Sequence, residues 1–471
     1  MIYSLPEYYT TINGKTFKFP DMKSFLSLER FKPELNRSVL PFYLCHGMSC
    51  NEQTLLNGVY RKPPKLTLHY SGYEGETAID WWAKEFWGRL CSVVEAFAKN
   101  KKVGVLLSGG LDSAIVAAAL KQCGITFTCY TLGGDEAESA QELVEYLKMH
   151  IRTTYANLGS SFDIGKELTY FQSLYDEPLI KFTFIPTFYL VNSAKDEVDI
   201  LFTGDGGDEL FIGYRKDYWN DPLVVSIFSK LGILRKPLLI LCDRLVTPLA
   251  NSTHLKQLSL ASEFFERPNA SDSEWRYRIA SRVFQPYLSE TDLKCIMLNN
   301  TINTIHEVSE AIMDTPLDKV EAISHAMLKG ELYNDMFRVW KSMSVVPNIE
   351  FCSPLLEELI VDFATSIPIS FRYRNGITKY FLRYVAEHYA GLPEFVYKQK
   401  AKVGLSASVY EWLNNPQHKC YFQSLLSRGC DTLGLNRGFL HKVFPPRTYT
   451  QSLKAWNLVG LSLWADMFLR R

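Results

Sequence analysis

The sequence predicts an α/β fold: a doubly wound parallel sheet with helices on both faces, a helical C-terminal part and a small β-rich N-terminal piece. Three observations lead to this prediction. Apolar runs of strand length alternate with helical segments from residue 101 onward, as in a parallel sheet. Glycine-rich turns directly follow two of these strands, and the residues beyond about 220 have almost entirely helical patterns.

The expected elements of the sheet follow one another closely along the chain. An acidic, tryptophan-containing helix at about 77–98 comes first. We then expect strands at 103–107, 126–132, 153–156 and 199–203, and helices at 114–123, 137–149 and around 185–195.

The two ends of the chain differ in character. Residues 1 to about 75 are strand-like and rich in turns, and Pro63 and Pro64 form a rigid break before the helix at about 77–98. The segment from Trp456 to Trp464 is apolar around much of its circumference, so this helix must be buried. We therefore predict a reduced β-rich N-terminal region at 1–75 and one large domain at 76–471.

Composition excludes several classes of protein. The 471 residues include 51 basic and 51 acidic side chains, and 47% are hydrophobic, which favours a folded, neutral protein and no nucleic-acid partner. Two apolar segments, 103–120 and 222–246, contain charges and are predicted not to span a membrane. The N-terminus lacks the pattern of a signal peptide. We expect a cytoplasmic location.

The ten cysteines are scattered and contain no Cys-x-x-Cys pair. In a chain of this length they indicate reduced thiols rather than a disulfide framework. Cys45, His46 and Cys50 resemble the start of a zinc site, but no second pair at a familiar spacing completes it. We interpret them as structural residues.

The first glycine-rich turn lies between an apolar strand and a helix. Its residues are Ser108, Gly109, Gly110, Leu111, Asp112 and Ser113. Successive glycines let backbone N–H groups close around an anion, and the helix N-terminus adds partial positive charge. No Gly-Lys-Ser/Thr follows, so this is not the Walker A pattern, and Asp112 needs a cation between itself and a phosphate. The turn predicts a pyrophosphate site with Mg²⁺; the alternative is an ordinary strand-to-helix turn.

The second turn, residues 203–214, also follows an apolar strand and contains Asp205 and Asp208. By itself it is equally typical of a calcium loop or a plain turn. Loops that follow parallel strands emerge at the carboxyl edge of the sheet. We therefore expect Asp112 and Asp208 to bind one metal ion together.

Together the two turns resemble the synthetase domain of asparagine synthetases, in the ATP-pyrophosphatase group that also includes β-lactam synthetases and lasso-peptide cyclases. Residues 176–178, 376–383 and 398–405 are similar to three further motifs of that family, and the resemblance covers roughly residues 80 to 470. It implies an ATP-dependent amide-forming ligase. A substrate carboxylate would attack the α-phosphorus of ATP, Mg²⁺-pyrophosphate would leave, and an amine would displace AMP. Leu132, Gly204 and Lys379 would join the first turn in binding ATP.

The resemblance also implies a late catalytic lysine that neutralises charge on the α-phosphate and then on the oxyanion. Lys402, two residues before Gly404, is the first choice. Lys400 is the alternative, because two spacings occur in the family. For each of them a solvated surface lysine is the competing interpretation.

The substrate side of the site both follows and departs from the family. Asp205 stands where asparagine synthetases have an acid and β-lactam synthetases a tyrosine, so it could orient or deprotonate ammonia or an amine. Glu350 resembles the glutamate of the family's Glu-x-Arg-x-Pro-Phe-Leu-Asp segment and is expected to face the substrate. Cys352 replaces the arginine of that segment, Glu357 replaces its aspartate, and Trp340 stands where aspartate is usual. These changes favour a substrate other than aspartate.

The beginning of the chain is the largest departure. Glutamine-dependent members carry a nucleophilic cysteine directly after the initiator Met, whereas this chain has Ile2. Only residues 54–64 resemble the end of a glutaminase domain. We expect no glutamine hydrolysis, so nitrogen would come from ammonia, a separate amidotransferase or an amine on the substrate.

The identity of the substrate stays open. It could be aspartate, a sugar uronate or other cell-surface acid, or a peptide or small molecule that closes a ring. A nucleotide-binding pseudoenzyme that acts as a scaffold is the rival from another class. A tRNA-modifying ATP-pyrophosphatase is a further rival, but it predicts a basic excess and paired catalytic cysteines.

Overall fold

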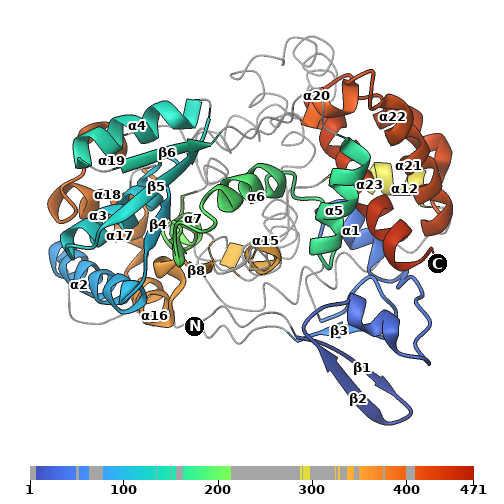
Figure 1. Cartoon of the computed structure of the whole chain (residues 1–471), viewed down its shortest axis with the longest axis horizontal. Coiled ribbons are helices and arrows are strands. Elements are labelled where there is room, and N and C mark those ends of the chain that lie inside the picture. Colours follow the sequence, from blue (N-terminus) through green and yellow to red (C-terminus); the bar gives the residue numbers. More distant parts are fainter. Residues whose placement is uncertain are drawn as a thin grey trace, which may run out of the picture.

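The computed structural model describes residues 7–48, 52–62, 78–133, 135–148, 150–154, 163–213, 287–288, 290–297, 324, 327–328, 337–343, 349–374, 377–398 and 409–470. Its centre is a five-stranded sheet in the order β6-β5-β4-β7-β8 (Figure 1). The strands are β4 (Val103–Leu106), β5 (Phe127–Leu132), β6 (His150–Thr154), β7 (Ile200–Phe202) and β8 (Glu350–Cys352). Every neighbouring pair is parallel. The predicted doubly wound parallel sheet is confirmed.

The order of the strands determines where a ligand can bind. The chain runs outward from β4 to β6 on one side and then returns to the other side of β4 for β7 and β8. The strand order therefore reverses at β4, between β5 and β7, and open α/β sheets bind their ligands at the carboxyl edge of such a switch point. Both glycine-rich turns are located there.

Two predicted boundaries were displaced. The strand expected at 153–156 begins at His150, and the helix expected from residue 114 begins at Leu111. Gly110, in extended conformation, is the residue before this helix. The earlier start places Asp112 in the first helical turn, where the helix dipole favours a negative charge.

Side chains of the sheet alternate between two hydrophobic cores. Phe127 and Cys129 point into one core, and Tyr130 and Leu132 into the other. The first core contains helices α2 (Ile79–Ala98), α3 (Leu111–Gln122), α4 (Asp135–Leu147), α16 (Glu358–Ser366) and α18 (Tyr380–His388). Short elements complete this side: α7 (Gly207–Leu210), η7 (Pro354–Leu356), α17 (Ile369–Arg372) and α19 (Glu394–Tyr397).

The second core extends from the sheet into the C-terminal helices. Its central helix, α23 (Tyr449–Phe468), is buried along most of its length as predicted, and Trp456 and Trp464 are fully buried. The surrounding helices are α1 (Leu40–His46), α5 (Ile164–Leu174), α6 (Phe184–Ser193), α12 (Glu290–Ile296), α15 (Phe337–Met343), α20 (Val409–Asn414), α21 (Lys419–Leu433), η8 (Arg437–Phe439) and α22 (Leu440–Val443).

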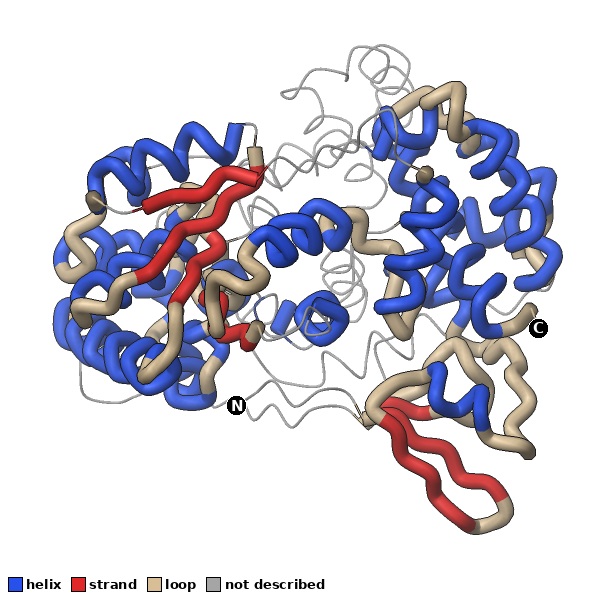
Figure 2. Tube along the Cα trace, viewed as in Figure 1, coloured by secondary structure: helices blue, strands red, loops and turns tan. Residues whose placement is uncertain are grey.

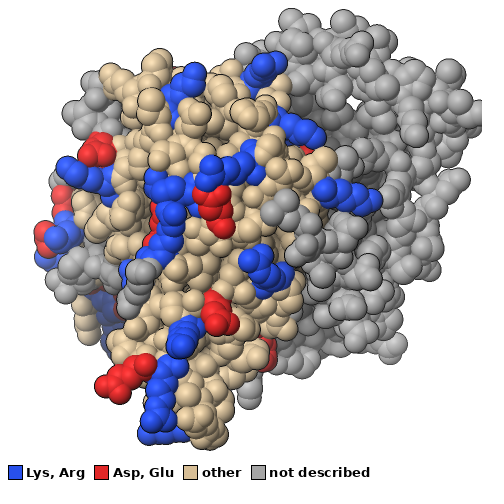
Figure 3. All heavy atoms as spheres, turned by 90° about the vertical axis from the view of Figure 1, so that its right-hand side faces the viewer, with Lys and Arg blue, Asp and Glu red and all other residues tan. Residues whose placement is uncertain are grey.

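Surface charge on these helices is mixed. Figure 3 shows basic and acidic side chains interspersed over the described part of this face. Several of them form ion pairs, such as Arg428 with Asp466 and Arg437 with Asp431.

The N-terminal piece is a small antiparallel sheet in the order β2-β1-β3, from β1 (Tyr8–Ile12), β2 (Lys15–Phe19) and β3 (Tyr60–Arg61), with η1 (Lys23–Ser27) after the hairpin. Figure 2 shows its hairpin well separated from the parallel sheet. The turn at residues 176–178 joins it to the helices: the Met22 amide donates to Asp176 Oδ1 at 3.0 Å, and Trp464 Nε1 donates to the Asp176 carbonyl at 3.2 Å. Tyr43 donates to the neighbouring Glu177.

No helix within the described ranges combines the length and apolar character needed to cross a membrane. The apolar segment at 103–120 is β4 followed by α3, in agreement with the prediction. The segment at 222–246 lies outside the described residues.

Candidate functional site

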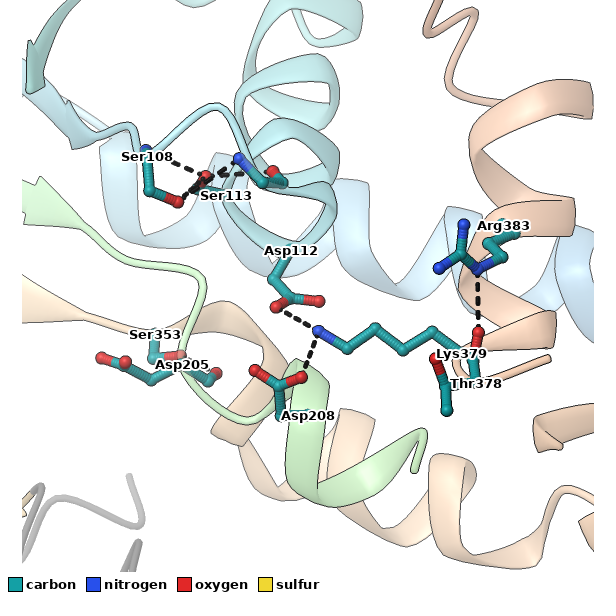
Figure 4. Close-up of polar contacts among 10 residues, drawn as sticks. Ser108, Asp112, Ser113, Asp205, Asp208, Ser353, Thr378, Lys379 and Arg383 are labelled. Atoms are coloured by element: carbon teal, nitrogen blue, oxygen red, sulfur yellow. Dashed lines mark hydrogen bonds and ion pairs between the residues drawn. The ribbon is translucent and has the colours of Figure 1, made fainter. Parts of the chain in front are cut away.

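The loop after β4 closes tightly against the N-terminus of α3. Gly109 has a φ of +70°, and a Cβ there would come within 2.6 Å of Ser139 Cβ on α4, so this position requires glycine. The Ser108 amide donates to Ser113 Oγ at 3.3 Å, and Ser113 Oγ donates to the Gly110 carbonyl at 3.2 Å. These contacts hold the loop in the arrangement shown in Figure 4.

The loop after β7 leads into the short helix α7, which carries Asp208. Arg372, fully buried, donates to the Leu210 carbonyl at 3.3 Å and to the Ile367 carbonyl at 3.1 Å. Because Leu210 is the last residue of α7, this guanidinium fixes the end of the helix and thereby the position of Asp208.

Lys379 connects the two loops. Its Nζ lies 2.5 Å from Asp112 Oδ2 and 2.6 Å from Asp208 Oδ1 (Figure 4). The three side chains are buried, with exposures of 8%, 11% and 8% for Lys379, Asp112 and Asp208. The two carboxylates predicted from the sequence to converge therefore do converge.

The backbone at Lys379 is fixed although its side chain is long. The residue has a left-handed conformation with a φ of 52°, directly before α18. Its amide donates to the Phe211 carbonyl at 3.1 Å, which connects it to the end of the second loop. Arg383 Nε donates to the carbonyl of the preceding Thr378 at 2.8 Å.

Space around these charges comes from two glycines. A Cβ at Gly207 would meet the Asp112 carboxylate, and a Cβ at Gly213 would meet Asp208 Oδ1 and Lys379 Cε. Any larger residue would push the charged groups apart. With two carboxylates and one ammonium, the cluster has a formal charge of −1 and favours further positive charge.

The donor set fits Mg²⁺. Both aspartates already hold one cation, the Lys379 ammonium, between their oxygens. Mg²⁺ is commonly bound by one or two carboxylates together with the phosphates of a nucleotide. No group of three or more His, Cys, Asp or Glu side chains suited to a metal is found in the part of the chain that the structure describes. Asp112 and Asp208 would therefore hold the ion together with phosphate oxygens.

Asp205 is held on the other side of the second loop. Thr203 Oγ1 and Trp340 Nε1 each donate to its Oδ2 at 2.8 Å, and Ser353 Oγ donates to its carbonyl at 2.5 Å. The Trp340 ring also packs on Phe351, with ring centroids 5.0 Å apart. The Thr203 and Trp340 donors, both neutral, orient the carboxylate.

Comparison with known proteins agrees with this geometry. The asparagine synthase family profile matches residues 91–466, most of the chain. The chain belongs to the asparagine synthase family. Family membership implies an ATP-dependent amide-forming ligase domain.

Curated relatives carry the name of this family. Asparagine synthetase (glutamine-hydrolyzing) 1 of Bacillus subtilis is 22% identical over 493 residues, with 99% of this chain and 74% of that protein covered. A putative asparagine synthetase of Mycobacterium bovis is 25% identical over 333 residues, with 68% of this chain and 47% of that protein covered. The chain thus spans about three quarters of one relative and about half of the other.

Most of the residues that the family resemblance assigned to ATP lie at the carboxyl edge of the sheet. Leu132 ends β5, Gly204 follows β7, and Lys379 lies against the first turn through Asp112. Lys400 and Lys402 lie outside the described residues. Trp340 was predicted only as a departure from the family on the substrate side, not as a donor to Asp205, and Arg372 was not predicted, since a buried indole donor and a buried guanidinium have no local sequence signature.

Glu350 lies elsewhere. It begins β8 opposite Ile200, the first residue of β7, and its Oε2 lies 2.6 Å from Lys101 Nζ. Lys101 precedes β4, so this ion pair is at the amino edge of the sheet, away from both loops. The expectation that Glu350 faces the substrate is not supported by this position. The physical reason is the register: the carboxyl edge begins only after Cys352.

Cys352 and Glu357, which stand where the family has an arginine and an aspartate, are buried. Cys352 is fully buried, and burial raises the pKa of its thiol well above the ordinary value. Burial also raises the pKa of Glu357. The neutral Cys352 cannot take over the charge of the arginine that it replaces.

Proposed function

We propose that this protein is an AMP-forming amide ligase that activates a substrate carboxylate as an acyl-adenylate. One observation carries the proposal: two aspartates from loops at the switch point of the sheet meet at a single cation, with Lys379 Nζ 2.5 and 2.6 Å from their oxygens. One carboxylate would be enough to pair with the single Lys379 ammonium, so the second acid is not needed for the ion pair. It suits a metal-bound polyphosphate.

In the first half-reaction a carboxylate oxygen of the substrate attacks the α-phosphorus of ATP. The bond to the bridging oxygen between the α- and β-phosphates breaks, and pyrophosphate leaves with that oxygen. The first loop would bind the phosphates through its backbone N–H groups at the start of α3. Mg²⁺, held by Asp112 and Asp208, would neutralise charge on the leaving pyrophosphate.

In the second half-reaction an amine attacks the acyl carbon, AMP leaves, and the nitrogen loses a proton. Asp205 is the group proposed to orient the amine and accept that proton. Its Oδ2 is occupied by Thr203 and Trp340, which would fix the orientation of the carboxylate. A late lysine, Lys402 or alternatively Lys400, would stabilise the negative charge on the acyl oxygen.

The substrate side of the site supports an acid other than aspartate. Trp340 and Cys352 replace an aspartate and an arginine of the family, and both replacements are neutral and buried. A pocket without those charges loses partners for the charged groups of a free amino acid. A sugar uronate or other cell-surface acid, or a carboxylate on a peptide or small molecule that closes a ring, therefore suits it better.

The test is isotope exchange between labelled pyrophosphate and ATP, with Mg²⁺ and a panel of acids but no amine. Aspartate, uronic acids and peptide carboxylates form the panel. We expect exchange with one class of acid, and AMP as the product once an amine is added. Formation of ADP and phosphate instead would overturn the proposal, and a lack of exchange with every acid despite tight ATP binding would favour the pseudoenzyme.

A further inference from the structure

We propose that the Lys379 ammonium occupies, in the nucleotide-free protein, the position between Asp112 and Asp208 that Mg²⁺ takes when ATP binds. Lys379 is then an internal counter-cation that the metal must displace. This inference rests on the proposed function in one respect, that the two aspartates are the metal-binding carboxylates.

The first argument is geometric. Lys379 Nζ contacts one oxygen of each carboxylate, at 2.5 and 2.6 Å. Mg²⁺ binds its oxygen ligands at ~2.0–2.1 Å. An ion bound to the same two oxygens would overlap Nζ or face its positive charge at a separation of a few ångströms. The ammonium and the metal ion therefore compete for the two carboxylates.

The second argument concerns buried charge. Asp112 and Asp208 are about nine-tenths buried, and two unpaired carboxylates in such a place would destabilise the fold. The Lys379 ammonium removes one of these two negative charges. It lets the site keep two acids ready for the metal in a stable protein.

The third argument is that the ammonium can move while its backbone stays in place. The Lys379 amide is hydrogen-bonded to Phe211, and helix α18 begins at the next residue. The side chain reaches the acids through a flexible four-carbon stem. Gly213 has no side chain, and the Lys379 stem passes through the place that a Cβ there would take. The displaced ammonium would remain close to the phosphates and could bind them.

The test uses thermal unfolding of the full chain without nucleotide, with and without Mg²⁺, at constant ionic strength. In the wild type we expect Mg²⁺ alone to change the melting temperature little. Lys379→Met keeps the stem and removes the charge. This variant should melt several degrees lower without metal, and Mg²⁺ should restore it with an apparent Kd at least about tenfold below that of the wild type.

Lys101→Met is the matched control. Lys101 also forms a close ion pair, 2.6 Å from Glu350, but it contacts a single, more exposed carboxylate at the other edge of the sheet. Its loss should produce no response to Mg²⁺. The double variant Lys379→Met/Asp208→Asn has one acid and no ammonium, so without metal it should melt at a higher temperature than Lys379→Met, and it should lose the Mg²⁺ response.

Several results would overturn the inference. One is an equal effect of Mg²⁺ on the wild type and on Lys379→Met; another is unchanged metal-free stability of Lys379→Met. If Lys379→Met folds only with Mg²⁺, the inference is supported, whereas failure to fold with Mg²⁺ contradicts it. Pyrophosphate exchange by the wild type reports separately on the proposed function, because that exchange can require Mg²⁺ even if Lys379 does not compete with it.

Discussion

Replacing Asp208 by asparagine tests the two-carboxylate site most directly. Asp208→Asn removes one unit of negative charge and almost no volume. The Asn oxygen can still accept a hydrogen bond from Lys379, which lies 2.6 Å from Asp208 Oδ1 in the wild type. The cluster changes from a formal charge of −1 to 0, so its charge is balanced without a metal. We therefore expect the free energy of unfolding to change by no more than about 1 kcal/mol.

The effect on catalysis should be far larger. Two unit charges 4 Å apart interact by about 4 kcal/mol at an effective dielectric constant of 20. Loss of one of two charges that hold the metal should cost a similar amount, about 3–4 kcal/mol, in the transition state. The corresponding loss of Mg²⁺-dependent pyrophosphate release is about 10²–10³-fold. Asp112→Asn should behave in the same way.

The assay is pyrophosphate release at saturating Mg²⁺ with the acid identified by isotope exchange. Asp431→Asn is the control, because Asp431 is an exposed acid paired with Arg437 on the C-terminal helices. It should retain the wild-type rate within about twofold. A wild-type rate for either Asp208→Asn or Asp112→Asn, with normal stability, would refute the metal-binding role of that residue.

Four further predictions follow from the site and the core. Lys402→Ala should leave ATP binding intact and reduce turnover by about 10²–10³-fold, whereas Lys400→Ala should cost less than about tenfold; reversed effects would identify Lys400 as the catalytic lysine. The purified chain should form no glutamate from glutamine, and stoichiometric release would contradict this. Trp340→Phe keeps an aromatic side chain and removes the N–H donor to Asp205, so amine transfer should slow by about tenfold while pyrophosphate exchange stays unchanged. Equal loss in both assays would argue against a role in positioning Asp205. Burial lowers the pKa of His46 to about 3, so the unfolded state takes up a proton before the folded state does as the pH falls. The free energy of unfolding should therefore decrease below about pH 6.5, by about 2 kcal/mol at pH 5. A His46→Gln variant that keeps this pH dependence in denaturant titrations would show that His46 is not its cause.

Local sequence patterns were sufficient for four of the five strands of the parallel sheet and for its two loops, whereas β8 (Glu350–Cys352) lies in a part of the chain predicted to be helical. Strand and helix periodicity depends on near neighbours, and successive glycines directly after a strand indicate an anion-binding turn from the residue types alone. Since parallel strands present their carboxyl ends at one edge, the meeting of Asp112 and Asp208 could be predicted without coordinates. The family resemblance rested on the same loops, and the match over residues 91–466 confirmed it.

Only the tertiary structure determined which groups complete the cluster. Lys379 is 267 residues from Asp112, and Trp340 is 135 residues from Asp205. No local pattern shows which buried donor a distant helix brings to an acid. For Glu350 the strand register removed a predicted site residue instead of adding one. Its pairing with Ile200 leaves Glu350 at the amino edge of the sheet, next to Lys101. The sequence by itself determined four strands of the sheet, the two loops and their carboxylates, because these depend on local backbone geometry. The fifth strand and the partners of those carboxylates depend on how distant segments pack, and only the folded chain decides that.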